Sequence, residues 1–427
     1  YDNRTIEDFT GEPLRFRDGT PCGKPLSFTG SVRVPVTVNR PGVYRFSYAG
    51  ALSNPVRVEE GLNGPYWGDI HIHSRLSHDA QGNDPFSYAR DVSGLDFAGL
   101  ADHWDSIGPE GYAVLERWLE EADAEGEFVT IPGDERNPEK LTGHHNMYFR
   151  DREYFRENQV FPGEGQKSDP AGEARELRNM DPERVMLIPH HTGIVFGKLP
   201  ERGIGAAVNL EAWDDPGLRP VMEIYSHHGQ SELYSPAHFY AYEFNRMRRP
   251  ERRSNTSVPG PYYARDYWKV GYRMGVISSS DEHSGQGGRR YGGIAAVFAD
   301  RLNRETLFDG IRNRRCYGTT GERILLDFSV DGLGMGQEGV RRKGAELPVR
   351  LKVWATEILL RVEILRYRPE RDNDFIPIIS EPPRPERMDY EIELMDVPDG
   401  PAVYYARIIQ EPLSRPGMAW SSPVWIT

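Results

Sequence analysis

The stretch Gly68-Asp-Ile-His71-Ile-His73-Ser74 carries the strongest fold signal in this sequence. It is predicted to be a β-strand, in which residues two positions apart point to the same face. His71 and His73 can therefore reach the same metal ion, a spacing suited to a pair of ligands. The alternative is a pair of ordinary surface or core histidines, so the sequence around this strand has to decide.

Strand-like and helix-like segments alternate from Tyr66 onward, which favours an α/β domain with a largely parallel sheet or barrel. Asp84-Pro85 is typical of a helix start, and Gly94 suits the end of the same helix. Further strands are expected at 95–100, 128–131, 185–188, 221–224 and 276–277, and further helices at 110–124, 262–274 and 304–314.

Short β-strands are expected at both ends of the chain. Alternating runs at 31–38 and 43–48 predict a small β module, and the sequence after Ile324 returns to short strands with Asp-Gly turns. Two long stretches, about 151–183 and 195–220, are expected either to wall the active site or to be solvated insertions. The predicted domains are an N-terminal β module at 1–65, an α/β barrel with the metal site at 66–323 and a C-terminal β-sandwich at 324–427.

The composition is that of an acidic globular chain. Its 427 residues include 38% hydrophobic residues, enough for two or three domains with buried cores. The net charge of −13 argues against broad contact with nucleic acid or an anionic membrane, so a small-molecule substrate is expected. The most apolar stretch, 354–365, is interrupted by charges, and the first residues lack a secretion-signal pattern. The compartment and the oligomeric state stay open.

Histidines and carboxylates recur at the downstream ends of successive predicted strands, where an α/β barrel collects its active site. Taken singly, each has an ordinary alternative as a core histidine, a helix cap or a turn residue. Taken together they favour metal binding, because burying so many titratable groups without a cation is costly. Mixed imidazole and carboxylate ligands suit Zn²⁺, Mn²⁺ or Fe²⁺. The motifs are Asp102-His103, Gly133-Asp-Glu135, Gly143-His-His-Asn146, His190-His191, Glu223 with Ser226-His-His228, and Ser280-Asp-Glu-His283.

This series of motifs resembles the PHP (polymerase and histidinol phosphatase) superfamily, and more closely its DUF3604 branch. The resemblance covers about residues 55–340 and implies a metal-dependent hydrolase. The implied fold is a distorted (β/α)7 barrel, here flanked by N-terminal and C-terminal β-sandwich-like elements. The segments that carry the DUF3604 resemblance are Tyr66-Trp-Gly-Asp-Ile-His71, Gly143-His-His-Asn146, Glu223-Ile-Tyr-Ser-His-His-Gly-Gln-Ser-Glu232 and Arg315-Cys-Tyr-Gly-Thr-Thr-Gly-Glu-Arg-Ile324.

The resemblance further implies two or three divalent metal ions (Mn²⁺, Zn²⁺ or Fe²⁺). The first ion would lie among His71, His73, Glu135 and Asp281. The second would share Glu135 with His144 and His190. The third would take His103 and His283 together with His78, for which Asp79 is a competing ligand.

The adjacent histidine pairs are ambiguous, because neighbours on a strand face opposite sides. Motif alignment favours His144 and His190 as ligands, which leaves His145 and His191 as candidates to orient other ligands. His227 is expected to be structural.

The expected chemistry is hydrolysis by a water that bridges two cations, with a phosphoester as the leading substrate class. Glu135 is central to it, and His103 or His283, where not on a metal, could transfer a proton. His228 and Glu232 are expected to line the pocket.

Arginines near the motifs could form a fork for a phosphate group, with an ordinary solvated charge as the alternative for each. They are Arg75, Arg136, Arg289 and Arg290. Two other functions remain open. One is hydrolysis of an amide or carboxyl ester at the same metal site, and the other is a non-catalytic carbohydrate-binding or scaffolding role with a vestigial barrel.

Overall fold

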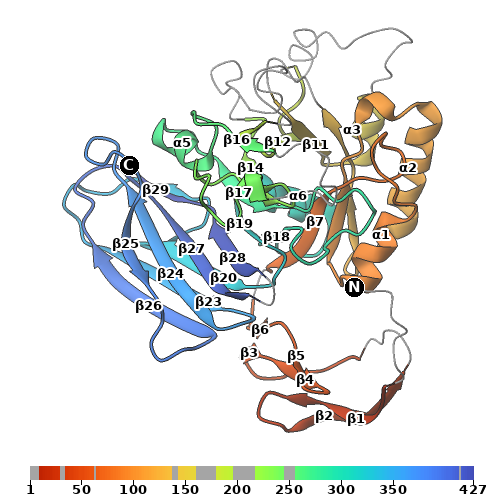
Figure 1. The fold of residues 1–427 in the computed structure, drawn as a ribbon, viewed down its shortest axis with the longest axis horizontal. Coiled ribbons are helices and arrows are strands. Elements are labelled where there is room, and N and C mark those ends of the chain that lie inside the picture. Colours follow the sequence, from red (N-terminus) through yellow and green to blue (C-terminus); the bar gives the residue numbers. More distant parts are fainter. Residues whose placement is uncertain are drawn as a thin grey trace.

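The computed structural model describes residues 9–28, 34–61, 64–136, 143–159, 179–195, 217–244, 255–412 and 415–427. They form a mixed α/β structure that is rich in strands (Figure 1). The long stretches predicted at 151–183 and 195–220 lie largely outside the described residues. None of the described helices is long and apolar enough to cross a membrane.

The N-terminal strands form two small sheets. The strand predicted at 31–38 is wrong for its described part, because residues 34–38 pair with no other strand and Pro35 has no N–H to donate. The run at 43–48 is divided at Arg45, whose buried guanidinium bonds the carbonyl of Ala355 and the carboxylate of Asp389. The strands are β1 (Phe9–Phe16), β2 (Pro21–Phe28), β3 (Gly42–Tyr44), β4 (Phe46–Tyr48), β5 (Ala51–Leu52) and β6 (Val56–Val58).

The central region holds the predicted alternation of strands and helices. Its strands are β7 (Tyr66–Ile72), β8 (Phe97–Leu100), β9 (Val129–Ile131), β10 (Gly133–Arg136), β11 (His145–Phe149), β12 (Val185–Pro189), β13 (Ile194–Val195), β14 (Val221–Ser226), β15 (Gly229–Gln230), β16 (Thr256–Ser257), β17 (Gly275–Ser278), β18 (Ile294–Val297) and β19 (Cys316–Thr319). Its helical segments are α1 (Pro85–Ser87), η1 (Tyr88–Val92), η2 (Trp104–Ser106), α2 (Pro109–Ala122), α3 (Arg152–Glu157), η3 (Tyr242–Phe244), α5 (Ala264–Lys269) and α6 (Arg304–Arg312).

Helix ends follow the predicted signals with one correction. The Asp84 side chain accepts a hydrogen bond from the backbone N–H of Ser87, and Gly94 has a positive φ of 62° where the helical segment ends. The helix predicted at 262–274 is shorter than expected. It ends at Lys269, because Gly271 adopts a left-handed φ of 96°.

Strand direction in the central region is mixed, which corrects the expectation of a largely parallel sheet. Parallel pairing joins β7 to β8, β8 to β9, and β14 to β17. In contrast, β10, β11 and β12 pair in an antiparallel way, as do β7, β18 and β19. The short connection from β10 to β11 is long enough only for antiparallel neighbours, since a parallel crossover needs a dozen or more residues.

The C-terminal region consists of strands in two sheets that share one buried core. Phe328 and Leu351 come from one sheet, Val362 and Ile408 from the other, and all four belong to the same apolar cluster. The strands are β20 (Leu325–Val330), β21 (Leu333–Gly334), β22 (Glu338–Gly339), β23 (Leu347–Trp354), β24 (Leu359–Tyr367), β25 (Ile376–Glu381), β26 (Asp389–Asp396), β27 (Ala402–Pro412), β28 (Pro416–Ser421) and β29 (Val424–Ile426).

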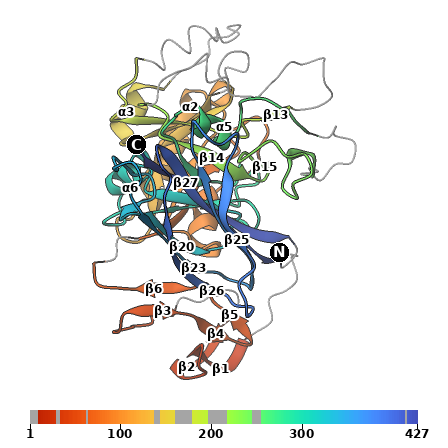
Figure 2. The ribbon, with the colours of Figure 1, turned by 90° about the vertical axis from the view of Figure 1, so that its left-hand side faces the viewer.

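Hydrogen bonding continues from the central region into the C-terminal strands. Strand β19 pairs with β28, so the sheet that contains β7 runs on into β27 and β29. Both ribbon views show β1 to β6 at one end of the molecule, below the rest (Figures 1 and 2). The predicted domain limits at 65 and 323 stay predictions.

Candidate metal centre

Backbone hydrogen bonds hold together the chain ends that carry the predicted ligands. The N–H of His73 donates to the carbonyl of Glu282 at 2.8 Å, and the N–H of Glu135 donates to the carbonyl of Asp102 at 3.0 Å. The end of β7 therefore lies beside the segment after β17, and β10 lies beside the segment after β8. Residues far apart in the sequence meet at one place.

Two buried carboxylates hold the loops around the predicted ligands through hydrogen bonds. Asp102 accepts hydrogen bonds from the backbone N–H and the hydroxyl of Ser74, at 2.6 and 2.8 Å. Asp69 accepts from the backbone N–H groups of Ser280 and Gly288, at 2.9 and 2.8 Å. Burial raises the pKa of Asp69 to about 6, which these donors partly offset. Both carboxylates thus hold the backbone of the loops in position.

Four donor atoms form a compact first group: His71 Nε2, His73 Nε2, Glu135 Oε2 and Asp281 Oδ1. The two imidazole nitrogens lie 3.2 Å apart, and their distances to the two carboxylate oxygens run from 3.2 to 3.6 Å. Four ligands around a tetrahedral ion, with bonds of about 2.1 Å, would be about 3.4 Å apart. These five distances fit a site for one cation.

The imidazoles of this group are fixed through their other ring nitrogens. His71 Nδ1 lies 2.9 Å from the Glu223 carboxylate, and His73 Nδ1 lies 3.0 Å from the Ser77 hydroxyl oxygen. With a proton on Nδ1 donated outward, the lone pair of Nε2 points into the group. Glu223 belongs to the predicted metal-binding motifs, but its contact with His71 could not be foreseen from the sequence.

A second group forms on the other oxygen of Glu135. Glu135 Oε1 lies 3.2 Å from His144 Nδ1 and 3.2 Å from His190 Nε2. Gly133 allows β10 to approach β11 closely, because a Cβ at this position would collide with the carbonyl oxygen of Met147. Glu135 thus lies between the two groups, in the position predicted for a bridging ligand, while ligation itself stays a prediction.

A third group contains Asp79, His103 and His283. Asp79 Oδ2 lies 3.3 Å from His103 Nε2 and 3.1 Å from His283 Nε2. The structure thus brings Asp79 to both imidazoles, while the prediction of His78 as a ligand stays a prediction. The side chain of His78 is 59% exposed, and its ring stacks on the outer side of His103 with 4.7 Å between centroids.

The remaining histidines of the adjacent pairs have separate environments. The ring of His145 lies with Nδ1 3.2 Å from the carbonyl oxygen of Gly143. His191 turns inward, and its ring centroid is 4.2 Å from that of His190.

After β14, His227 and His228 face different partners. His227 Nδ1 lies 2.9 Å from the carbonyl oxygen of Ser280, which gives this residue a structural contact. His228 Nε2 lies 2.9 Å from Asp281 Oδ2, the oxygen that does not face the first group. His228 therefore contacts a predicted metal ligand.

Glu232 requires a correction, since it does not line a pocket. Its side chain is fully buried, and its carboxylate bonds the guanidinium groups of Arg265 and Arg407 at 2.9 and 2.8 Å. The hydroxyl of Tyr405 and the indole N–H of Trp420 also donate to it. The residue joins the loop after β15 to the C-terminal strands.

Each predicted phosphate-binding arginine has a protein contact of its own. The guanidinium of Arg75 lies over the ring of Trp118, at 5.4 Å, and that of Arg290 lies over Tyr291, at 5.5 Å. Arg289 lies 3.4 Å from the Glu282 carboxylate. Arg136 is buried and bonds Asp134 at 2.9 Å. In the described part of the chain, these contacts do not themselves form a phosphate-binding fork.

Carboxylates and imidazoles in the centre shift each other's protonation strongly. Burial favours neutral carboxyls, but His103 and His190 hold the pKa of Glu135 well below its usual range. Burial also opposes charge on His73, yet Asp281 and Glu135 raise the pKa of that imidazole to about 10. Glu223 behaves differently, because burial raises its pKa to about 7 and His71 offsets this only in part. Without a cation, protons on imidazoles balance the buried carboxylates.

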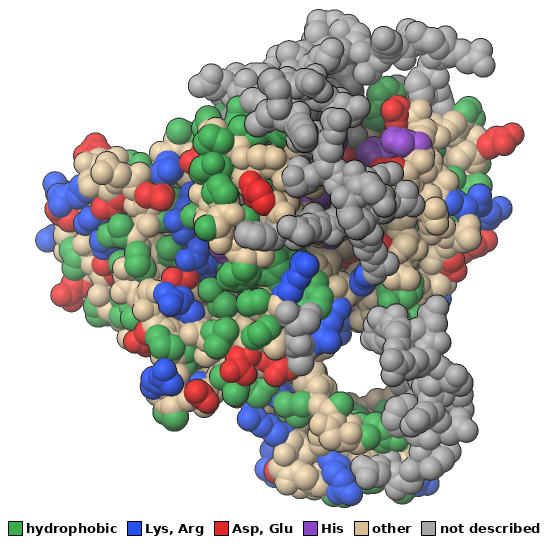
Figure 3. Space-filling model, viewed as in Figure 1, with side chains coloured by type: hydrophobic (Ala, Val, Ile, Leu, Met, Phe, Trp, Pro, Cys, Tyr) green, Lys and Arg blue, Asp and Glu red, His purple; other side chains and the backbone are tan. Residues whose placement is uncertain are grey.

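The centre is buried at its middle and open at one side. His71, His73 and His190 are 0% exposed, whereas the side chains of His283 and Asp79 are 29% and 37% exposed. In the space-filling view, histidine side chains reach the surface at the upper right, beside acidic side chains (Figure 3). The third group is thus the part of the centre closest to solvent.

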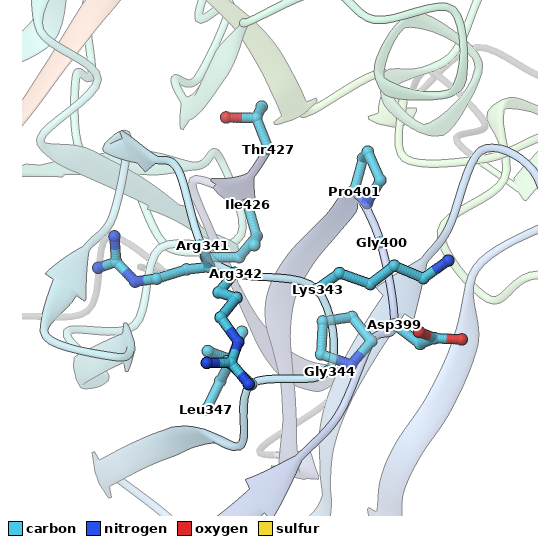
Figure 4. Close-up of a pocket in the computed structure, with 12 residues that line it drawn as sticks. Arg341, Arg342, Lys343, Gly344, Leu347, Asp399, Gly400, Pro401, Ile426 and Thr427 are labelled. Atoms are coloured by element: carbon cyan, nitrogen blue, oxygen red, sulfur yellow. The ribbon is translucent and has the colours of Figure 1, made fainter.

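A separate pocket of about 190 Å³ lies in the C-terminal region (Figure 4). It is bordered by the loop between β22 and β23, the turn before β27 and the end of β29. No histidine lines it. Its lining residues are Arg341, Arg342, Lys343, Gly344, Ala345, Leu347, Pro398, Asp399, Gly400, Pro401, Ile426 and Thr427.

Comparison with protein families gives a match at residues 286–340, to the model described as protein of unknown function (DUF3604). The predicted resemblance to DUF3604 is confirmed. The DUF3604 match begins just after His283 and covers β18, α6, β19 and β20. It includes the segment 315–324, one of the four on which the prediction rested.

The DUF3604 resemblance is accompanied by similarity to uncharacterized chlamydial proteins. A protein of Chlamydia pneumoniae is 24% identical over 443 aligned residues, which cover 93% of this chain and 64% of that protein. A protein of Chlamydia trachomatis serovar D is 29% identical over 153 residues, or 31% of this chain and 22% of that protein. The chain thus spans between 22% and 64% of the length of these curated relatives.

One solved structure is similar with a TM-score of 0.43 and 13% sequence identity, covering 85% of this chain and 96% of that chain. It is a two-domain protein from Bacteroides vulgatus ATCC 8482, whose name says that it contains a predicted PHP-like metal-dependent phosphoesterase.

Proposed function

We propose that this protein is a metal-dependent hydrolase that cleaves phosphoesters. The observation that carries the proposal is the first group, in which two imidazole nitrogens lie 3.2 Å from each other and 3.2 to 3.6 Å from each of two carboxylate oxygens. Buried acids and imidazoles at this spacing need positive charge to balance them, from a cation or from protons on the imidazoles. The donor set and its dimensions therefore fit a divalent ion.

Glu135 and Glu223 would have different roles in the centre. Glu135 would hold two ions at once, because its two oxygens face the first and the second group. Glu223 would keep the Nε2 lone pair of His71 directed inward by accepting a hydrogen bond from Nδ1–H. When bound, paired divalent ions acidify water and stabilise negative charge on a phosphoryl or carbonyl oxygen.

The leaving group would receive its proton at the solvent-facing side of the centre. His283 and His103 lie there and share Asp79, which orients both imidazoles. If this third group holds no cation, either imidazole could donate the proton that a departing alkoxide needs. If it holds one, His103 and His283 become ligands, together with Asp79. The proposal includes two or three ions of Mn²⁺, Zn²⁺ or Fe²⁺.

The proposal also includes the fold of the central region. We infer that the central region corresponds to a distorted (β/α)7 barrel with β-sandwich-like elements on both sides. What supports this is the parallel pairing of β7, β8 and β9 and the meeting of loop-borne ligands at their carboxyl ends.

The test is a substrate screen of metal-reconstituted protein with phosphomonoesters, phosphodiesters, carboxylic esters and amides. We expect metal-dependent release of phosphate or alcohol from at least one phosphoester. Turnover of carboxylic esters or amides alone would replace phosphoester hydrolysis with the carbonyl alternative. Tight metal binding without turnover of any class would support the non-catalytic alternative.

A further inference from the structure

We propose that His191 is a further ligand of the second metal site, beside Glu135, His144 and His190. This inference rests on the proposed function, because it concerns the same metal centre. It adds an imidazole that the family resemblance does not assign.

The backbone at His191 departs from that of a strand. Strand β12 ends at Pro189, and His191 has a positive φ of 34°, which a non-glycine side chain rarely adopts. Two consecutive residues in an extended strand would face opposite sides. The left-handed turn instead brings the rings of His190 and His191 to the same side, with 4.2 Å between their centroids.

The ring of His191 lies near members of the second group and also near His228, whose ring centroid is 5.1 Å away. The centroid of the His191 ring lies 4.9 Å from that of His144. His144, His190 and His191 each offer a ring nitrogen, and these nitrogens lie within 4.8 Å of one another. Two nitrogens on one ion are at most about 4.2 Å apart, twice the length of a bond. Small movements of side chains would therefore complete a site with three imidazoles.

His145 provides the contrast within the same centre. It is as deeply buried as His191 and also follows a predicted ligand, His144. It lies within β11, in extended backbone. Its Nδ1 is 3.2 Å from the carbonyl oxygen of Gly143. Burial alone therefore does not distinguish the two residues, whereas backbone conformation does.

Four protein donors would change the coordination of the second ion. With Glu135 Oε1 and three imidazoles, a tetrahedral ion would have no place left for water. An ion that also holds water would be five-coordinate, a geometry that Zn²⁺ and Co²⁺ can adopt. We therefore expect four protein donors at each ion, two imidazoles and two carboxylates at the first, and three imidazoles and one carboxylate at the second.

The direct test is the crystal structure of the wild-type protein reconstituted with Co²⁺, located by anomalous diffraction. We expect a nitrogen of His191 within about 2.5 Å of the ion beside Glu135 Oε1. An ion held by Glu135, His144 and His190 with His191 more than about 3.5 Å away would overturn this inference and leave the proposed function intact. Absence of any ion in the centre would overturn both.

Variants give an independent readout in solution. We expect H191N to weaken binding of the second Co²⁺ equivalent by roughly 10- to 100-fold, with the first equivalent unchanged. H145N is the matched control, expected to change both affinities by less than about threefold. Added imidazole should restore second-site affinity in H191A, because it can replace a missing ligand. Wild-type affinity in H191N, or no recovery in H191A with imidazole, would contradict the proposal.

Discussion

The protein buries two clusters of acids, and they are neutralised in different ways. At Glu232, the carboxylate is surrounded by the permanent charges of Arg265 and Arg407, and Arg407 also bonds Glu363 at 2.6 Å. At Glu135, the described ion-pair partners of the carboxylate are imidazoles, His73 and His103 among them. One cluster is complete as it stands, and the other depends on groups that can lose their charge.

This difference separates a structural cluster from a functional one. Arginine stays charged at every physiological pH, so it holds Glu232 ionised and lowers the pKa of that carboxyl to about 2 against the effect of burial. Imidazoles can give up a proton and accept a metal ion in its place. Five predictions use this contrast, beginning with the largest expected effect.

Replacing Glu135 with Gln should have the largest effect. The substitution removes the negative charge that both metal groups share, so we expect turnover to fall on the order of 1,000-fold or more and bound metal to fall by at least one ion per chain. Activity assays and elemental analysis measure the two quantities. H227N is the control and should retain most activity, and equal losses in both variants would contradict the assignment.

Replacing Glu232 with Ala should affect stability instead of metal content. Two buried guanidinium groups would lose their partner, which costs about 3 to 5 kcal/mol in the free energy of unfolding. Urea denaturation measures this loss, and elemental analysis of the folded fraction should give the wild-type metal content. A lower metal content in folded protein would show that the two clusters are coupled.

Replacing Glu223 with Gln should weaken metal binding without removing a ligand. The amide can present its NH₂ group to His71 Nδ1 and disturb the tautomer that directs Nε2 inward, so a loss of affinity of about 10- to 100-fold is expected. Titration with Co²⁺ measures it, while E363Q in the arginine-paired cluster should bind Co²⁺ like the wild type. Unchanged affinity in E223Q would remove Glu223 from the account.

The smallest expected effect is the number of protons that the protein releases when it binds a metal ion. The pKa of His73 is raised to about 10 in the metal-free protein, so the proton is bound at pH 8 and must leave when a cation arrives. We expect release of at least about one proton per chain at pH 8, measured by calorimetry in buffers of different ionisation enthalpy. Metal affinity should then rise with pH, and binding without proton release would refute this protonation scheme.

The two clusters should also respond to pH in opposite directions in the metal-free protein. The stabilisation from His73 is fully present below about pH 6.5 and is lost as the pH rises through about 10. The stabilisation from Glu232 is present above about pH 4.5 and is lost as the pH falls through about 2. The second loss corresponds to about 3 kcal/mol, since one pKa unit is worth about 1.4 kcal/mol.

Sequence patterns predicted the parts of the molecule that depend on local order. Strands such as β7, β12 and β14 follow from apolar runs, and the meeting of His71, Glu135 and Asp281 follows from their places at strand ends. The bounds of α5 could not be foreseen in the same way, because the left-handed Gly271 ends that helix early.

Contacts between distant segments were the parts that could not be predicted. Nothing near Glu232 in the sequence indicates Arg407, and the contacts of Asp79 with His103 and His283 depend on how one loop turns. The inward turn of His191 depends on a single positive φ, which the strand rule for neighbouring residues does not anticipate.

The central claim is that the histidine-rich cluster exists to hold metal ions, and metal stoichiometry tests it most directly. Wild-type protein, stripped with a chelator, reconstituted with Mn²⁺, Zn²⁺ or Fe²⁺ and passed through a desalting column, should retain two or more ions per chain by elemental analysis. Fewer than one bound ion per chain with each of these metals would contradict the account.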